Sequence, residues 1–223
     1  MNIKLFFEAI IKYFLGVILV GLLLFLPAGT FKYINGLLFM GLLFIPMFIA
    51  GIIMMIKSPC LLKERLDVKE KESKQRVVVK ASALMFILGF VIAGLNYRYG
   101  WIKLPNIVVI IASIIFILSY VMYAVVLKQN AFLARTIKVD KEQKLITTGL
   151  YSIVRHPMYT ATIFLFLSMP LILNSIISFI IFLIYPFVIV ARINNEEEVL
   201  EKELNGYKEY KKKVKYKLIP FIW

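Results

Sequence analysis

Cysteine, histidine and charged side chains are all scarce in this sequence of 223 residues. The single cysteine, Cys60, cannot form an internal disulfide or contribute to a multi-cysteine metal site. The single histidine, His156, leaves a metal site to be built from carboxylates alone, which is unlike the ligand sets of zinc proteins. Charged residues make up 18% of the chain, against about 25% in soluble domains. These shortages argue against a disulfide scaffold, a zinc enzyme and an ordinary soluble domain.

Common catalytic signatures are missing too. The chain has no Gly-x-Gly-x-x-Gly after a strand, no phosphate-binding loop that ends in Lys-Ser or Lys-Thr, and no His-Glu-x-x-His. Any chemistry must therefore depend on a bound organic cofactor or on lipid, with no metal expected.

Hydrophobic residues, in contrast, form 61% of the sequence and are grouped into long uncharged runs. A helix needs roughly 20 apolar residues to cross a hydrocarbon core of about 30 Å. Four runs are close to this length: 19 residues between Lys12 and Lys32, 24 between Lys32 and Lys57, 17 at residues 81–97 and 24 at residues 104–127. They predict four membrane spans, with the first turn at residues 27–29.

A fifth run covers 36 uncharged residues, from His156 to Ala191. As one helix it would be about 54 Å long, which is too long for one crossing and a little short for two. We therefore expect a tight hairpin that turns at Asn174-Ser175. Pro170 and Pro186 fall inside its arms and should bend them, because each removes a backbone hydrogen bond. The fold class is thus all-α, an integral membrane helical bundle with about six spans, the last two a short hairpin.

The basic residues are distributed very unevenly between the connections. On a six-span layout, 24 Lys and Arg fall on one side of the membrane and 3 on the other, which predicts that both termini are cytoplasmic. The net charge of +14 then reflects anionic lipid and not nucleic acid. We expect a multi-pass protein of a bacterial plasma membrane, with a short surface helix or solvated loop at residues 57–80. Residues 1–127 and 128–223 form the two regions of one integral domain.

Arg192 and Glu196 lie four residues apart, so they share one face of a helix. The same face continues through Leu200, Leu204, Tyr207 and Val214, and is therefore apolar. The pair could be an ordinary i,i+4 ion pair worth about 0.2–0.5 kcal/mol. A charged pair at a hydrophobic boundary could instead be functional. The remaining charges of the segment are expected on a solvated face: Glu197, Glu198, Glu201, Lys202, Lys208 and Glu209.

His156 lies between Arg155 and Pro157, at the point where soluble chain enters the fifth apolar run. A lone histidine is more often structural than catalytic, and Tyr151 and Tyr159 could be aromatic residues of the membrane interface. The combination of these residues is more specific than any one of them.

Two motifs together resemble the isoprenylcysteine carboxyl methyltransferase family. The first is Gly149-x-Tyr151-x-x-x-Arg155-His156-Pro157-x-Tyr159, followed by the apolar hairpin. The second begins at Arg192-x-x-x-Glu196-Glu197 and closes with Tyr207-x-x-Tyr210 and Leu-Ile-Pro-Phe. The resemblance covers residues 130–223, and phospholipid N-methyltransferases share this C-terminal design.

The resemblance implies a methyltransferase that uses S-adenosylmethionine. Arg192 matches the arginine that meets the substrate carboxylate, and Glu196 matches the first glutamate of the family's pair, so these two are the implied catalytic residues. The implied cofactor-binding residues are Gln143, Lys144, Leu145, Ile146, Tyr151, His156, Pro157, Met158, Tyr159 and Glu196. The implied partner is a lipophilic or prenylated substrate that enters from the bilayer, among membrane lipid. Nothing in the sequence indicates the oligomeric state.

Methyl transfer to a carboxylate suits this residue set. A carboxylate has a pKa near 4, so it is ionised at neutral pH and needs no general base. Positioning and charge placement suffice, and the planar fork of Arg192 can hold the carboxylate. Three alternatives remain: a phospholipid N-methyltransferase, an NADPH-dependent membrane reductase of the sterol type, which has a similar ending, and a lipid-binding protein without enzymatic activity.

Overall fold

The computed structural model describes residues 3–67, 73–130 and 145–223, and within these ranges it is helical with no strand. This confirms the all-α fold class. In chain order the elements are α1 (Ile3–Ala28), α2 (Ile34–Lys57), α3 (Pro59–Leu66), α4 (Ser73–Tyr99), α5 (Asn106–Gln129), a 3-10 helix η1 (Gly149–Ser152), α6 (Pro157–Ile172), α7 (Ile176–Phe182), α8 (Tyr185–Glu203) and α9 (Tyr207–Lys213).

Five helical segments of the described residues are long and apolar enough to cross a membrane: α1, α2, α4 from Arg76, α5, and the combined run of α7 and α8. α6 is a shorter apolar helix of 16 residues. The chain is therefore an integral membrane helical bundle, as the sequence predicts. The first arm of the last hairpin, α6, is short, whereas the α7–α8 run that forms the second arm covers 28 residues. Large apolar side chains remain exposed along α1, α2 and α5, where a lipid-facing surface requires them.

Several helices extend beyond the uncharged runs. α1 begins at Ile3 and includes Lys12, whose ammonium pairs with Glu8 at 2.6 Å one turn earlier. Lys12 also donates to the carbonyl oxygen of Leu66 at the end of α3, at 2.7 Å. Pro27 lies inside α1, so the first turn begins at Gly29, later than expected.

The hairpin turns where predicted, between the end of α6 at Ile172 and the start of α7 at Ile176. Asn174 adopts a φ of 58°, and the Ser175 hydroxyl caps α7 by accepting from the backbone N–H of Ser178 at 3.3 Å. Pro170 lies inside α6 as expected. Pro186 differs, because it occupies the first turn of α8, after the chain has left α7. A proline is tolerated in a first turn, where its missing N–H has no helical acceptor.

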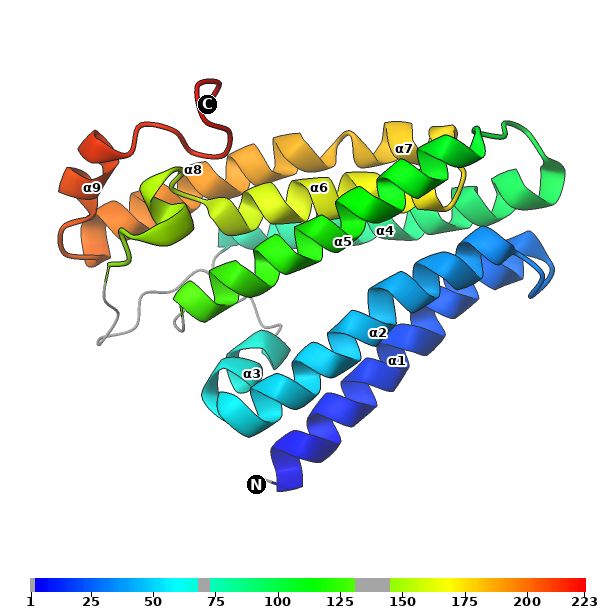
Figure 1. Ribbon diagram of the computed structural model, residues 1–223, viewed down its shortest axis with the longest axis horizontal. Helices are drawn as coiled ribbons and strands as arrows, with labels where there is room; N and C mark the ends of the chain where they lie inside the picture. The colour runs from blue at the N-terminus through cyan, green and yellow to red at the C-terminus, as the bar shows by residue number, and fades with distance from the viewer. Residues whose placement is uncertain (1–2, 68–72, 131–144) are drawn as a thin grey trace.

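α1 contacts α4 near the C-terminal ends of the two helices, and α5 packs along α6 (Figure 1). The contact between α1 and α4 is close at Gly94, since a Cβ there would lie 2.5 Å from the carbonyl oxygen of Leu24. Buried aromatic and aliphatic side chains from α1, α2 and α4–α8 form one core. The bundle has two distinct ends: α3, α9 and the C-terminus lie at one, and the α1–α2, α4–α5 and α6–α7 turns lie at the other (Figure 1).

Candidate functional site

The entry into α6 is held by the C-terminal tail. The backbone N–H of Arg155 donates to the carbonyl oxygen of Tyr216, and that of His156 donates to Lys217, both at 2.9 Å. Pro157 then begins α6 and is buried. Because these bonds join residues about 60 positions apart, the conformation of the Arg-His-Pro segment depends on tertiary structure.

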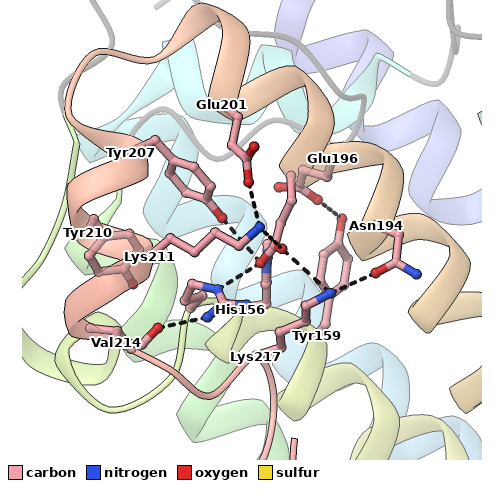
Figure 2. Close-up of polar contacts among 12 residues, drawn as sticks. His156, Tyr159, Asn194, Glu196, Glu201, Tyr207, Tyr210, Lys211, Val214 and Lys217 are labelled. Carbon is pink, nitrogen blue, oxygen red and sulfur yellow. Dashed lines mark hydrogen bonds and ion pairs between the residues drawn. The ribbon is translucent and has the colours of Figure 1, made fainter.

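Glu197 is the buried centre of a cluster formed with Arg155, His156, Lys211 and Lys217, called here the Glu197 cluster. Its Oε1 accepts from Arg155 Nε at 2.7 Å and lies 3.1 Å from His156 Nε2. Its Oε2 lies 3.5 Å from the ammonium nitrogens of Lys211 and Lys217 (Figure 2). The Glu197 side chain is only 5% exposed. The prediction that Glu197 lies on a solvated face is therefore wrong.

Arg155 links this cluster to the tail. Its Nη1 donates to the carbonyl oxygens of Val214 and Lys215, each at 2.8 Å. Since a carboxylate only accepts hydrogen bonds, Nε2 of His156 carries a proton when it bonds Glu197. A carboxylate this deeply buried would be unfavourable alone, but several cationic partners compensate for its lost hydration. The cluster therefore fixes α8, the entry to α6 and the tail relative to one another.

Tyr159, Arg192 and Glu196 form a second group, called here the Tyr159 triad. Arg192 Nε donates to the Tyr159 hydroxyl oxygen at 2.9 Å, and that hydroxyl donates to Glu196 Oε2. The Arg192 guanidinium also lies over the Tyr159 ring, 5.9 Å from its centroid. Tyr159 is buried, while Arg192 and Glu196 are half-buried. The structure thus brings together three of the predicted site residues, from α6 and α8.

Tyr151 lies in η1 and is buried. Its carbonyl oxygen accepts from the Tyr210 hydroxyl at 2.7 Å, and its own hydroxyl lies 3.2 Å from Asn130 Nδ2, which donates to it. Burial raises the pKa of Tyr151 to about 12, so its hydroxyl stays protonated at neutral pH. Gly149 permits this turn: its φ is 62°, and a Cβ would lie 2.2 Å from Gln129 Nε2.

The remaining predicted cofactor residues are distributed around these groups. Leu145 packs against a small apolar cluster in which Tyr207 and Tyr210 of α9 are buried, and Ile146 follows it, half-buried. Burial, with the nearby Glu197 carboxylate, raises the pKa of the Tyr207 hydroxyl well above its ordinary value. Met158 follows Pro157 in the first turn of α6. Gln143 and Lys144 lie outside the described residues.

The predicted continuous face from Arg192 to Val214 is interrupted. α8 ends at Glu203, Gly206 adopts a φ of 82°, and a separate helix, α9, begins at Tyr207. Leu204, Tyr207 and Val214 still share one buried cluster, because the turn folds α9 back onto the end of α8. The prediction that these residues face the interior is therefore confirmed. The prediction that one continuous helix carries them is wrong.

Arg65 of α3 is a candidate site residue that the sequence analysis did not name. Its Nη2 lies 3.4 Å from Met158 Sδ, and its guanidinium carbon lies 5.4 Å from the centroid of the Tyr123 ring on α5. Its Nε is buried and has no hydrogen-bond partner among the described residues. α3 was expected to be a surface helix or a solvated loop, but Leu61 and Leu62 are buried and turn Arg65 inward. The two leucines, Leu61 and Leu62, within an otherwise charged stretch are the sequence feature that could have indicated a buried face on this helix.

Comparison with known proteins finds similarity in this region. Residues 105–206 match the family described as phospholipid methyltransferase, which confirms the predicted resemblance to membrane methyltransferases. The matched region extends from the start of α5 to the turn after α8, and therefore contains the Tyr159 triad and Glu197. A Delta(14)-sterol reductase of Mus musculus is 29% identical over 91 residues, which are 40% of this chain and 22% of that protein. The chain thus spans about a fifth of that relative's length.

Proposed function

We propose that this chain, whose residues 105–206 match the phospholipid methyltransferase family, is a membrane methyltransferase that uses S-adenosylmethionine and acts on the carboxylate of a lipophilic acceptor. The observation that carries the proposal is the Tyr159 triad. One buried hydroxyl contacts both the Arg192 guanidinium and the Glu196 carboxylate, so a cation and an anion are held at one point.

The residues present fit S-adenosylmethionine, which carries a sulfonium, an ammonium and a carboxylate. Glu196 offers a half-buried carboxylate for a positive charge. Two buried donors, Arg65 Nε and Asn195 Nδ2, have no hydrogen-bond partner in the described parts of the chain. Buried donors are nearly always satisfied, so these two suit a polar ligand with acceptor oxygens. When bound, S-adenosylmethionine supplies an electrophilic methyl group.

The protein's own contribution is positioning and charge placement. Arg192 binds the acceptor carboxylate with its fork of N–H groups and orients one oxygen for in-line attack. The carboxylate is already ionised, so no residue has to remove a proton. The Tyr159 hydroxyl holds the Arg192 and Glu196 side chains in fixed positions relative to each other. The Glu197 cluster keeps the entry of α6 fixed beside them. A lipophilic acceptor would enter from the bilayer, while the polar cofactor would enter from the end that carries α3 and α9.

Two other activities have specific support. The name of the matched family favours a phospholipid amine as acceptor. The partial likeness to a sterol reductase favours NADPH in place of S-adenosylmethionine. A protein that only binds lipid would bind neither cofactor.

Binding of S-adenosylmethionine and NADPH to the purified protein in detergent, measured by calorimetry, tests the cofactor. We expect S-adenosylmethionine alone to bind. Incubation of membranes with S-adenosylmethionine labelled in its methyl group then tests the acceptor. A base-labile methyl ester supports a carboxylate acceptor, whereas label in a base-stable N-methyl lipid would contradict it. Binding of NADPH alone would overturn the methyltransferase assignment.

Variants of the triad separate the two proposed ligands. Arg192→Ala should impair acceptor use by about tenfold or more and leave cofactor affinity intact, since an anionic acceptor loses a charged hydrogen-bond partner. Glu196→Ala should chiefly weaken cofactor binding. Arg192→Lys should rescue only partly, because a point charge lacks the fork.

Tyr159→Phe should affect both ligands moderately, because the hydroxyl touches both charged side chains. If Arg192→Ala and Glu196→Ala show the same loss for both ligands, the triad is a structural interaction and not an active site.

A further inference from the structure

A polar pocket lies at the opposite end of the bundle from the candidate site. Its volume is about 500 Å³, and it opens between the α1–α2 turn, the end of α4 and the α6–α7 turn. Thr30, Tyr33, Asn35, Arg98 and Lys103 contribute to its lining. Neither the matched family nor the proposed methyl transfer assigns a role to it.

The walls of the pocket are fixed by side-chain hydrogen bonds to the α6–α7 turn. Tyr33 donates its hydroxyl to the carbonyl oxygen of Leu173, and Asn35 Nδ2 donates to that of Ile172 at 3.0 Å. Asn96 Nδ2 donates to the carbonyl oxygen of Asn174 at 3.1 Å. Since these bonds join three separate elements, the pocket is preformed.

The cations of the pocket have no counter-charge among the residues that the structure describes. Arg98 and Lys103 make no ion pair with any other residue that the structure describes. The sequence explains this, because all 13 acidic residues fall at position 8 or within residues 64–72, 140–142 and 196–209. The segments that build this end, residues 24–39, 90–109 and 169–178, contain no Asp or Glu.

Arg98 is nevertheless held in a defined place. Its guanidinium lies against the turn at Gly29, where a Cβ would be 3.7 Å from its Cζ, Nε and Nη1 atoms. It also lies over the Tyr99 ring, 5.7 Å from the centroid. Tyr99 in turn stacks on Trp101. Aromatic residues grouped at the ends of spans are typical of the headgroup region of a bilayer.

We propose that this pocket binds the phosphate group of an anionic ligand, and that Arg98 and Lys103 supply the charge. A phosphate diester or monoester matches the two cations and the neutral hydroxyl and amide groups of the walls. The position at the ends of spans places the pocket in reach of lipid head groups, and the same chemistry would accept free phosphate. The proposal does not depend on the methyltransferase assignment, because the pocket and the candidate site are at opposite ends.

Crosslinking to a phosphatidylglycerol that carries a photoactivatable group in its head group tests the proposal on the full chain in a neutral detergent. Peptide mapping should place crosslinks within residues 28–35, 96–103 or 173–174. The Arg98→Gln, Lys103→Gln double variant should lose at least about tenfold of this crosslink, since two charged hydrogen bonds are removed. Lys32→Gln is the matched control: it removes an exposed cation of the same end that does not line the pocket.

Competition by inorganic phosphate and by unlabelled phosphatidylglycerol distinguishes the two sources. Stronger competition by the lipid identifies a head group, and equal competition by inorganic phosphate identifies a free anion; either supports the phosphate site. All the variants should melt close to the temperature of the unaltered protein without lipid, because neither cation has an ion pair to lose among the described residues and the contact of Arg98 with the Tyr99 ring is exposed. Equal crosslinking at these peptides in the double variant and in Lys32→Gln would overturn the proposal.

Discussion

Two adjacent carboxylates, Glu196 and Glu197, have entirely different surroundings. Glu196 accepts from Tyr159 beside Arg192, whereas Glu197 is buried among Arg155, His156 and two lysines. Successive residues of a helix point about 100° apart, so one glutamate faces the proposed site and the other faces its support. The same helix turn therefore supplies a proposed ligand contact and a positioning residue.

Replacement of Glu197 should destabilise the fold. Glu197→Gln keeps the shape of the side chain but removes the charge that the buried Arg155 guanidinium and two less buried lysines face, which should cost about 3 kcal/mol and lower the melting temperature by about 6–12 °C. Glu203→Gln on the same helix is the control, because Glu203 is exposed. Thermal unfolding in detergent measures both, and equal melting temperatures would show that the Glu197 cluster contributes little.

The charge of Arg65 should contribute to the affinity for S-adenosylmethionine. Arg65→Gln is expected to weaken S-adenosylmethionine binding by about tenfold or more, since the buried Nε, which has no partner among the described residues, would no longer donate to the cofactor carboxylate. Decarboxylated S-adenosylmethionine, which lacks that carboxylate, should bind the unaltered protein and the Arg65→Gln variant equally. Lys63→Gln removes an exposed charge from the same helix and should change neither affinity. An equal loss for both cofactors would assign Arg65 a purely structural role.

At the scale of elements, glycines decide which helices can approach. Gly94 of α4 lies against α1, with the Leu24 carbonyl oxygen 2.5 Å and Pro27 Cβ 3.1 Å from the position of a Cβ. Gly51 of α2 has no atom within 4 Å of that position. Small residues allow close helix contacts in membranes, so the two glycines should respond differently to the same change.

Gly94→Ala should destabilise the bundle by about 1–3 kcal/mol, because α1 must move away from α4. Gly51→Ala should be neutral or slightly stabilising, because alanine favours helix by up to about 1 kcal/mol. Thermal unfolding of the two variants in the same detergent measures the difference. If Gly51→Ala lowers the stability as much as Gly94→Ala does, the effect is a general one of glycine replacement and not one of the α1–α4 contact.

At the scale of the whole molecule, the two ends differ in charge and in structure. One end carries α3, α9 and the tail, and the other carries three short turns (Figure 1). The Tyr159 triad and the Glu197 cluster belong to the first end, and the polar pocket lined by Arg98 and Lys103 lies at the second. The 24-to-3 distribution of basic residues predicts that the first end is cytoplasmic.

Single cysteines in a Cys60→Ser background test this orientation in intact cells. Cysteines at the exposed positions Lys4 and Lys215 should resist a thiol reagent that cannot cross the membrane, and a cysteine at the exposed Lys32 should react. After the cells are opened, all three should react. Labelling of Lys4→Cys or Lys215→Cys from outside would reverse or break the six-span layout.

The sequence by itself determined three features: most of the chain lies in the membrane, the spans occupy particular residues, and the last hairpin turns at a particular position. Each of these depends on local properties: run length, charge and the residues at 174–175. The motif around His156 and the pair of Arg192 and Glu196 were also readable, because residue type and spacing along one helix face are local.

Only the tertiary structure decided which groups meet. Glu197 reads as a solvated residue because its partners come from positions 155–156 and from the far side of the Gly206 turn. Arg65 reads as a surface charge because the contacts that direct it inward lie on α5 and α6. Helical periodicity assigns each residue to a face of its own helix, but the partner of that face is set by packing between segments far apart in the chain. Burial and pairing of these charges are therefore properties of the folded bundle.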